Sequence, residues 1–249
     1  MVCLAFIGLI CACSSSGDGL TQKEGEFSFA MSGLYKPYNY RENGELTGFD
    51  KEIGDAIAKE MGLKPKAVSN PFETIIDGLN GQKYDAVIGS LGITEKRKEA
   101  VEFSQPYYRS GAQVFIRKGD HSIKSTDDLK GKKIGVLKAS TYMDLAKEYS
   151  DQIVEYTSDP VALNDLPTGR VDAVITDEGV GDYAIQQGLE IEKMGEPLTH
   201  DEMGIAVKKG NKELQQKIDQ ALEAIIEDGT YEKISKKYFG RNILYGGQE

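Results

Sequence analysis

The segment GSLGITEKRKEA, residues 89–100, places a cation where a helix does not favour one. Thr94 is a suitable N-cap, so Arg97 falls in the first turn, where the helix dipole repels positive charge. Because helix propensity does not favour a cation at position 97, we expect an anion beside Arg97. Two partners are open: Glu95 in a surface ion pair, or a ligand carboxylate, which a guanidinium holds with two parallel hydrogen bonds.

A second group of donors occurs in KIGVLKASTYMDLAKEY, residues 133–149, where an apolar strand leads into a helix. Lys138, Ser140 and Thr141 stand at this junction, and the free N–H groups of a helix start attract anions. An ordinary N-cap explains the same residues. Together with Arg97, the motif predicts two sets of donors for one carboxylate.

An acidic residue, Asp177, ends a further apolar strand, DAVIT at residues 172–176. It can cap the next helix or, if it faces Arg97 across a cleft, bind an ammonium group. A carboxylate site and an ammonium site on opposite walls are what an α-amino acid requires. The sequence therefore suggests an amino-acid site, with capping as the alternative role of Asp177.

The elements that would position these residues include two copies of one unit. The segment KYDAVIGSL at 83–91 recurs as RVDAVITDE at 170–178, and aligning Asp85 with Asp172 brings Ser90 onto Asp177. A short amphipathic helix precedes each copy, and continuous apolar runs beside helices are typical of strands buried on both faces. Because ligands bind beyond the carboxyl ends of such strands, the repeat predicts two similar lobes facing one cleft.

Helices and strands alternate along the whole chain, which predicts an α/β fold with parallel sheets. The other predicted strands are 27–31, 112–116, 133–137 and 204–207. The other predicted helices are 50–61, 95–101, 141–149, 179–187 and a pair within 211–238. We expect the chain to cross between lobes near 111–114 and to return near 197–203. Lobe 1 is then 27–112 plus 203–240, and lobe 2 is 113–202.

The amino-terminal run MVCLAFIGLICAC contains all three cysteines, Cys3, Cys11 and Cys13. It is too short for a permanent membrane span and is similar to a lipoprotein-type signal, residues 1–13, with Cys13 as the lipidated residue. A buried apolar strand is the alternative. Residues 14–26 are predicted to be a flexible tether and 241–249 a C-terminal tail. A diacylated Cys13 would anchor the protein to a membrane.

The composition narrows the range of partners. Forty acidic and 30 basic residues give a formal charge of -10, which argues against nucleic acid, because phosphates are held by basic clusters. Beyond the first thirteen residues no cysteine is left for a disulfide or a thiolate metal site, and the two histidines lack zinc spacing. We expect no metal and no cofactor.

Six ordered motifs of the sequence resemble the amino-acid-binding proteins of bacterial ABC importers, the polar amino-acid class of periplasmic-type solute-binding proteins. They are YKPYNY, GELTGFDKEIGDAIAKEMG, PFETIIDGLNGQKYDAVIGSLGITEKRKEAVEFSQPYYRSG, LKGKKIGVLKAST, GRVDAVITDE and EDGTYEKISKKYFG. The resemblance, from about Phe27 to Gly240, implies a periplasmic-binding-protein type II-like fold, with a two-strand hinge and the ligand in the interlobe cleft. It implies a monomeric extracytoplasmic protein, not an enzyme, that captures a free amino acid and delivers it to an ABC transporter permease.

The resemblance also implies roles for single residues. Arg97 would hold the ligand carboxylate, with the backbone at Gly92 and with Thr141. Asp177 and Ser90 would hold the α-ammonium group. The other matches would surround the ligand side chain: Tyr35 and Phe72 as aromatic walls, Ser140 in the lining, and Lys138 reaching toward the side chain.

Ser32 bears on the choice of ligand. It stands where relatives that bind cationic amino acids usually carry Asp, and a buried cation needs a paired anion. With Ser32 neutral and Lys138 near the pocket, we expect a neutral polar or acidic amino acid, such as glutamine or cystine, unless acids elsewhere in the pocket replace the missing Asp.

Three other functions fit parts of the sequence. A dehydratase-like enzyme of the same fold would need a catalytic carboxylic acid in the cleft, and no Gly-x-Ser-x-Gly elbow is present. Residues 179–184 imitate a dinucleotide fingerprint, but Asp177 and Glu178 would repel a pyrophosphate. A ligand-sensing receptor module would need a spanning helix, for which the tail RNILYGGQE is too short.

Overall fold

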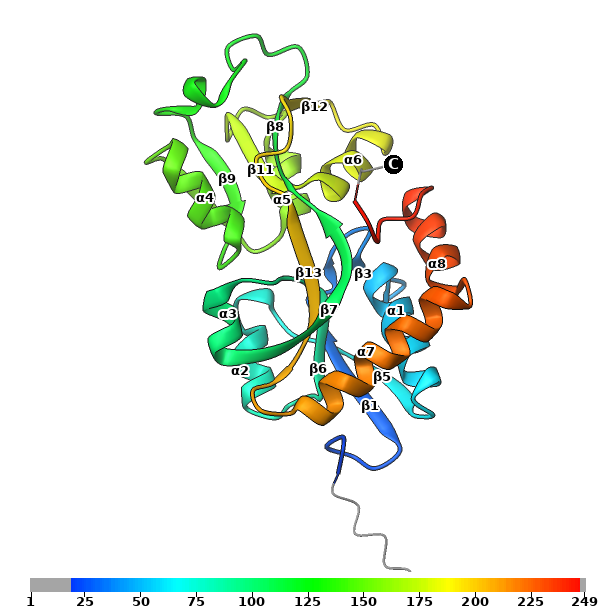
Figure 1. The fold of residues 1–249 in the computed structure, drawn as a ribbon. Helices are drawn as coiled ribbons and strands as arrows, with labels where there is room; N and C mark the ends of the chain where they lie inside the picture. Colours follow the sequence, from blue (N-terminus) through cyan, green and yellow to red (C-terminus); the bar gives the residue numbers. More distant parts are fainter. Residues whose placement is uncertain (1–18, 247–249) are drawn as a thin grey trace, which may run out of the picture.

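Two five-stranded sheets, one in each lobe, form the frame of the protein in a computed structural model that describes residues 19–246 (Figure 1). Cys13 and the predicted signal lie outside the described residues. The first sheet has the order β5-β1-β6-β13-β7, with β1 Glu26–Met31, β5 Lys64–Ser69, β6 Ala86–Gly92, β7 Val101–Ser110 and β13 Asp201–Lys208. The second has the order β10-β9-β11-β8-β12, with β8 Ala112–Arg117, β9 Ile134–Leu137, β10 Ile153–Tyr156, β11 Ala173–Asp177 and β12 Ile191–Met194.

The sheets are mixed rather than purely parallel. In each sheet one strand, β13 or β8, runs antiparallel to both of its neighbours. Both reversed strands begin at the hinge and run away from it, whereas the strands reached through helices run toward it (Figure 1). The two-lobe α/β fold expected from the sequence is confirmed. Strands β8 and β13 are reversed because the chain enters each lobe through them directly from the hinge, without a helix before them.

The sequence repeat occupies the same place in both sheets. Strands β6 and β11 are third in their sheets, and helices α2 Ile75–Asn80 and α5 Asp159–Asp165 precede them. The Asp before each strand accepts a backbone hydrogen bond from the adjoining strand region: Asp85 Oδ2 from Ser28 N at 2.7 Å, and Asp172 Oδ2 from Lys133 N at 2.9 Å. This Asp therefore has a framework role in both lobes.

Helices cover both faces of each sheet (Figure 1). In the first lobe α1 Phe49–Glu60, α7 Lys212–Glu227 and α8 Thr230–Phe239 pack on one face, and α2 and α3 Glu95–Ala100 lie on the other. In the second lobe α4 Thr141–Tyr149 lies on one face, and α5 and α6 Glu178–Gln186 lie on the other. Helix α1 shows the cause, since Phe49, Ile53 and Ile57 recur at helical spacing and are fully buried.

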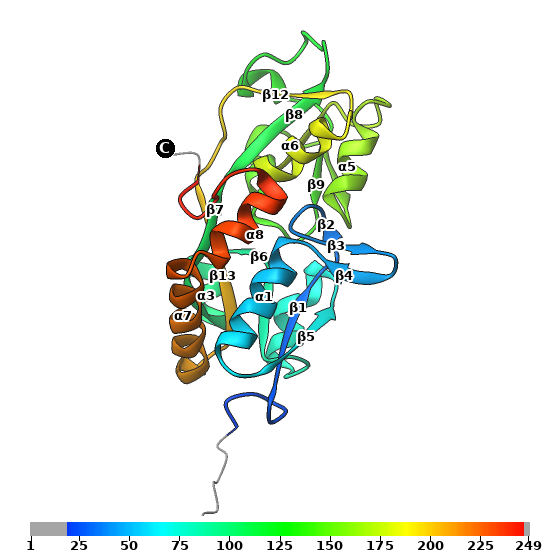
Figure 2. The ribbon, with the colours of Figure 1, turned by 90° about the vertical axis from the view of Figure 1, so that its right-hand side faces the viewer.

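Shorter elements complete the cleft. The one-turn helix η1 Phe72–Thr74 precedes α2, and η2 Thr126–Leu129 precedes β9. A small sheet of β2 Leu34–Tyr35, β3 Asn39–Glu42 and β4 Glu45–Thr47 belongs to the first lobe, and β2 contacts α5 of the second lobe (Figure 2). Within residues 19–246, no helix is long and apolar enough to cross a membrane.

Two chain segments join the lobes. The outgoing segment passes from β7 through Gly111 into β8, and the returning segment lies between β12 and β13. They are bonded to each other, since Leu198 N donates to Ala112 O at 2.7 Å and Ala112 N donates to Thr199 Oγ1 at 2.9 Å. These contacts make a two-strand hinge.

Both predicted end segments are partly packed on the first lobe. Gln22 N donates to Asp85 Oδ1 at 2.6 Å, so the described end of the predicted tether is attached to the sheet. Ile243 and Leu244 of the predicted tail are buried, and Arg109 N on β7 donates to Ile243 O at 3.1 Å. Residues 241–246 therefore belong to the folded body.

Candidate functional site

A cavity lies between the lobes and is lined by residues of both. Eight of the ten predicted binding residues line it: Ser32, Tyr35, Phe72, Ser90, Gly92, Arg97, Ser140 and Thr141. Its volume is about 30 Å³, which is smaller than an amino acid. The lobes are in contact beside it, since Ser158 Oγ donates to Leu34 O at 3.3 Å and Tyr38 OH donates to Asp177 Oδ1 at 3.0 Å. This structure is therefore a closed arrangement of the lobes.

Arg97 is held in place by its backbone and by one wall of the cavity. Thr94 caps α3 by accepting from Arg97 N at 3.2 Å, and Arg97 Nη1 donates to Gly92 O at 3.0 Å. The guanidinium lies 5.7 Å from the centre of the Phe72 ring, a cation–π contact. The sequence motif therefore folds as predicted at this point.

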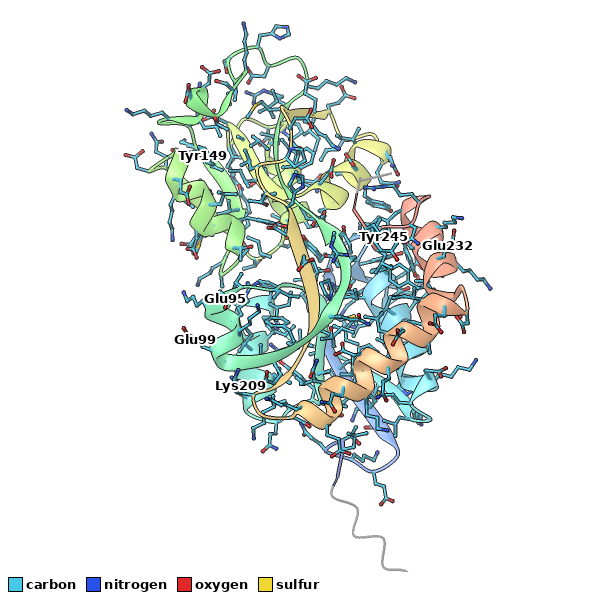
Figure 3. The ribbon with its side chains drawn as sticks, viewed as in Figure 1. Glu95, Glu99, Tyr149, Lys209, Glu232 and Tyr245 are labelled. Atoms are coloured by element: carbon cyan, nitrogen blue, oxygen red, sulfur yellow. The ribbon has the colours of Figure 1, made fainter. Side chains whose placement is uncertain are left out.

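The Arg97 guanidinium has no carboxylate partner within 4.0 Å in the part of the chain that the structure describes. Glu95, the alternative partner, pairs with Lys98 at 2.8 Å instead and projects from the outer side of α3 (Figure 3). Desolvation lowers the pKa of Arg97 from its usual value, yet an arginine remains charged at neutral pH. A partly buried, unpaired guanidinium in a closed cavity is a site for an anion.

The start of α4 lines the cavity opposite Arg97. Ser140 is the N-cap, accepting from Met143 N at 3.1 Å and donating to Leu137 O at 2.7 Å, so its hydroxyl is already used. Thr141 is the first helical residue, where backbone N–H groups have no partner within the helix. The capping role is present, and the capped helix start also lines the cavity.

Two further residues, Asp50 and Asn39, orient the serines of the cavity. Ser90 Oγ donates to Asp50 Oδ2 at 2.9 Å, and Ser32 Oγ donates to Asn39 Oδ1 at 2.9 Å. Asn39 Nδ2 in turn donates to Asp50 Oδ2 at 2.6 Å. Ser90 has a left-handed φ of 57°, a conformation that non-glycine residues adopt only when the surroundings hold it. The network therefore fixes two predicted binding residues.

Asp177 is fully buried and does not line the cavity. Its Oδ1 caps α6 by accepting from Gly179 N at 2.8 Å and also accepts from Tyr38 OH of the first lobe at 3.0 Å. Tyr142, which does line the cavity, has its hydroxyl 3.5 Å from Asp177 Oδ2. Burial raises the pKa of Asp177 to about 7. Asp177 therefore has the capping role that was the alternative in the sequence analysis. Through Tyr38 it also links the second lobe to the first.

Lys138 also lies outside the lining. Its ammonium group pairs with Glu73 of η1 at 3.0 Å, across the gap between the lobes, and about half of its side chain is exposed. This pair raises the pKa of Lys138. Lys138 lies outside the lining because of the backbone geometry. It follows β9 and precedes Ala139, whose left-handed φ of 61° turns the chain into α4.

Several lining residues were not predicted, and Asp159 is the one with chemical consequence. The others are Leu34, Gly89, Leu137, Tyr142, Thr157, Ser158 and Met203. Asp159 is 1 % exposed, and its Oδ1 accepts from Thr176 Oγ1 at 2.6 Å. Because the Asp-Pro pair at 159–160 is a usual helix start, this acid cannot be told from an ordinary capping residue by its pattern.

Two lining residues are charged, the cation Arg97 and the anion Asp159. Tyr35 and Tyr142 add polar hydroxyl groups to the lining. Among residues 19–246 there is no group of three or more His, Cys, Asp or Glu side chains that could hold a metal ion. The arrangement suits a small zwitterionic solute held by charge-assisted hydrogen bonds.

The two hinged lobes and the enclosed, charged cavity define a binding protein that closes around a small solute. The chain belongs to the bacterial extracellular solute-binding proteins, family 3, which match residues 27–241. It is 31% identical over 238 residues to the L-cystine-binding protein TcyJ of Escherichia coli (strain K12), covering 92% of this chain and 90% of that protein.

Two other relatives bind different solutes. The ABC transporter arginine-binding protein 1 of the same Escherichia coli strain is 35% identical over 222 residues, covering 86% of this chain and 90% of its own. The structure of an ancestral arginine-binding protein bound to glutamine has a TM-score of 0.82 at 40% identity, covering 88% of this chain and 100% of the other. The relatives are binding proteins, and their ligands differ.

Proposed function

We propose that this protein captures a free amino acid outside the cytoplasm by closing its two lobes and delivers it to the permease of an ABC transporter. The unpaired guanidinium of Arg97 in the interlobe cavity carries the proposal. Binding contacts from both lobes stabilise the closed state by their differential affinity, and the permease reads that state. A monomer anchored through a lipidated Cys13 suits this role.

The α-carboxylate of the ligand binds Arg97, the backbone at Gly92 and the start of α4 at Thr141. This gives the anion donors from both lobes. Ser90 takes the α-ammonium group, because Asp177 lies outside the cavity. Asp177 acts through Tyr38, which ties the second lobe to the first in the closed state.

The class of ligand follows from the charges of the lining. Lys138, one of two grounds against a cationic ligand, points away to Glu73, and Asp159 adds a negative charge that the sequence did not indicate. An acidic side chain would meet this carboxylate and is disfavoured. Polar amino acids with N–H donors remain, among them glutamine and cystine.

Capture without turnover is favoured over catalysis. The cavity of the described chain has no His, Cys or Lys in its lining. The dehydratase-like alternative requires a carboxylic acid there, and Asp159 is such a group. Incubation with prephenate-like acids, followed by product analysis, separates the two functions.

The proposal is tested by calorimetry of the purified protein with the twenty amino acids, cystine, ornithine and citrulline. We expect one or a few to bind, and Arg97→Ala to weaken binding at least about 30-fold, since removing one partner of a buried charge pair costs about 2 to 5 kcal/mol. Arg170→Ala is the control, because Arg170 is exposed and pairs with Asp165. Absence of binding by every compound, or equal affinity in the Arg97 variant, overturns the proposal.

A further inference from the structure

Asp159 has a buried carboxylate oxygen that makes no hydrogen bond to residues 19–246. Oδ1 accepts from Thr176 Oγ1, whereas Oδ2 is the oxygen without a partner in this part of the chain. Buried polar atoms of native proteins are nearly always paired, and an unpaired one costs about 1 to 3 kcal/mol, more when charged. Because Asp159 lines the cavity, a ligand group can supply the missing partner.

Asp159 belongs to the part of the cavity lining that is not shared with the groove beside Arg97. An outer groove beside α3 and α4 shares Phe72, Arg97, Ser140 and Thr141 with the cavity, and Asp159 does not border that groove. The described acids whose charge acts on Arg97 are Asp144 and Asp201. The two α-groups of an amino acid are attached to one carbon atom. When Arg97 holds the α-carboxylate, Asp159 therefore faces the ligand side chain.

We propose, on the basis of the amino-acid function above, that Asp159 selects ligands whose side chain carries a protonated nitrogen, an ammonium or a guanidinium group. Such a group donates to Oδ2 and neutralises the buried charge. Ser32 on the other lobe contributes no charge, so the anion that recognises the side chain belongs to the second lobe. The arginine, lysine and ornithine side chains qualify, as does the distal ammonium group of cystine.

The location of Asp159 couples selection to closure. Asp159 is the first residue of α5, and its neighbour Ser158 donates to Leu34 O of the first lobe at 3.3 Å. A cation held by Asp159 is therefore enclosed only when β2 and α5 meet. A ligand without that cation would leave the carboxylate unpaired in the closed state and lose part of the free energy of closure.

Calorimetry with matched pairs of ligands tests this inference. Arginine is compared with citrulline, and lysine with norleucine, with cystine, glutamine and glutamate in the same panel. We expect the tightest ligand to carry a side-chain cation and its matched neutral analogue to bind at least tenfold more weakly. Asp159→Asn should weaken the cationic ligand at least tenfold and reduce the discrimination within the pair to about threefold or less.

The control is Asp165→Asn, the same change on the same helix at a residue that pairs with Arg170 and Tyr156 outside the cavity. Tightest binding of a ligand whose side chain carries no ammonium or guanidinium group, or equal weakening of every ligand by Asp159→Asn, overturns the inference. Binding that needs Arg97 but ignores Asp159 refutes this inference alone. Absence of any amino-acid binding refutes the proposed function itself.

A measurement on the unaltered protein tests the same inference if Asp159→Asn does not fold. Burial raises the pKa of free Asp159 to about 6, and a bound cation would lower it, so binding at pH 6 should release about half a proton. Among the described residues, Asp159 acts on the ionisable groups of Tyr35 and Tyr142, whose pKa values burial raises well above 10. The binding enthalpy of arginine should then depend on the ionisation enthalpy of the buffer more than that of its neutral analogue. Equal dependence overturns the inference.

Discussion

The Oγ of Ser90 donates to Asp50 Oδ2 at 2.9 Å, and this bond links a cavity residue to a carboxylate that is fully buried in the first lobe. Tyr107 OH donates to Asp50 Oδ1 at 2.7 Å and accepts from Ser90 N at 2.9 Å, so Asp50 holds Ser90 from two sides. Burial raises the pKa of Asp50 to about 6. Asp50 is therefore a positioning residue for the ligand site rather than a contact.

Asp50→Asn should both destabilise the protein and weaken ligand binding. The new amide NH2 group would face either Tyr107 OH or the two donors of Asn39 and Ser90, and one unmatched buried polar group costs about 1 to 3 kcal/mol. We expect the free energy of unfolding in urea to fall by that amount and the ligand Kd to rise about tenfold. The fall in Ser90 order should appear as faster amide exchange at that residue.

The control for this prediction is Asp55→Asn on the same helix. Asp55 forms a partly exposed i,i+4 pair with Lys51, and such helix pairs contribute about 0.2 to 0.5 kcal/mol. If Asp50→Asn alters stability and affinity no more than Asp55→Asn does, the network has no positioning role.

The lobes and the anion site could be predicted because their signals are local. The apolar strands of the repeat are buried on both faces, and a continuous apolar run reports that directly. Arg97 was found because a cation in a first helical turn contradicts helix propensity. These two features predicted the two-lobe fold, which is confirmed, and singled out Arg97, which lines the cavity.

Whether Asp177 or Asp159 lines the cavity could not be predicted, because this depends on residues that are distant in the sequence. Asp177 is separated from the cavity by Tyr142 and bonded to Tyr38, residues 35 and 139 positions away in the chain. Asp159 begins α5 shortly after β10, and Asp177 ends β11 and caps α6, so both acids stand at strand-to-helix junctions and tertiary packing decides which of them reaches the cavity. A pattern along the chain does not contain that information.

The hinge glycine permits a close approach of the two connecting segments. A Cβ atom at Gly111 would lie 2.1 Å from the backbone oxygen of Thr199, so Gly111→Ala must push the segments apart. We expect a loss of about 1 to 3 kcal/mol in the free energy of unfolding and a more open ligand-bound state in small-angle X-ray scattering. Unchanged stability together with an unchanged scattering profile would show that the hinge yields without cost.

The pair of Glu73 and Lys138 should favour closure by a small, salt-sensitive amount. Both side chains are about half exposed, and exposed pairs contribute about 0.2 to 1 kcal/mol. Glu73→Gln should therefore weaken the ligand by up to about fivefold at low salt and by less at 0.5 M salt. Glu190→Gln, which breaks the pair with Lys118 within the second lobe, should leave the affinity unchanged. Equal effects of the two changes would contradict a role in closure.

Three buried acids should make the ligand-free protein more stable at mildly acidic pH than at pH 8. The pKa values of Asp50 and Asp159 are raised to about 6, and that of Asp177 to about 7, from an ordinary value of 3.8. Between 3.8 and these values the folded state binds more protons than the unfolded state, so the free energy of unfolding rises as the pH falls. Acids with lowered pKa values, such as Asp120 at about 2, reverse this trend below about pH 4.

The test is urea unfolding at pH 8 and pH 5.5 without ligand. One proton taken up across a pH unit is equivalent to about 1.4 kcal/mol, so we expect the free energy of unfolding to be about 1 to 3 kcal/mol higher at pH 5.5. Asp177→Asn keeps an acceptor for Gly179 N but cannot ionise, and it should remove the largest share of this difference. A wild-type protein that is less stable at pH 5.5, or a variant with the full wild-type difference, would show that Asp177 ionises normally inside the fold.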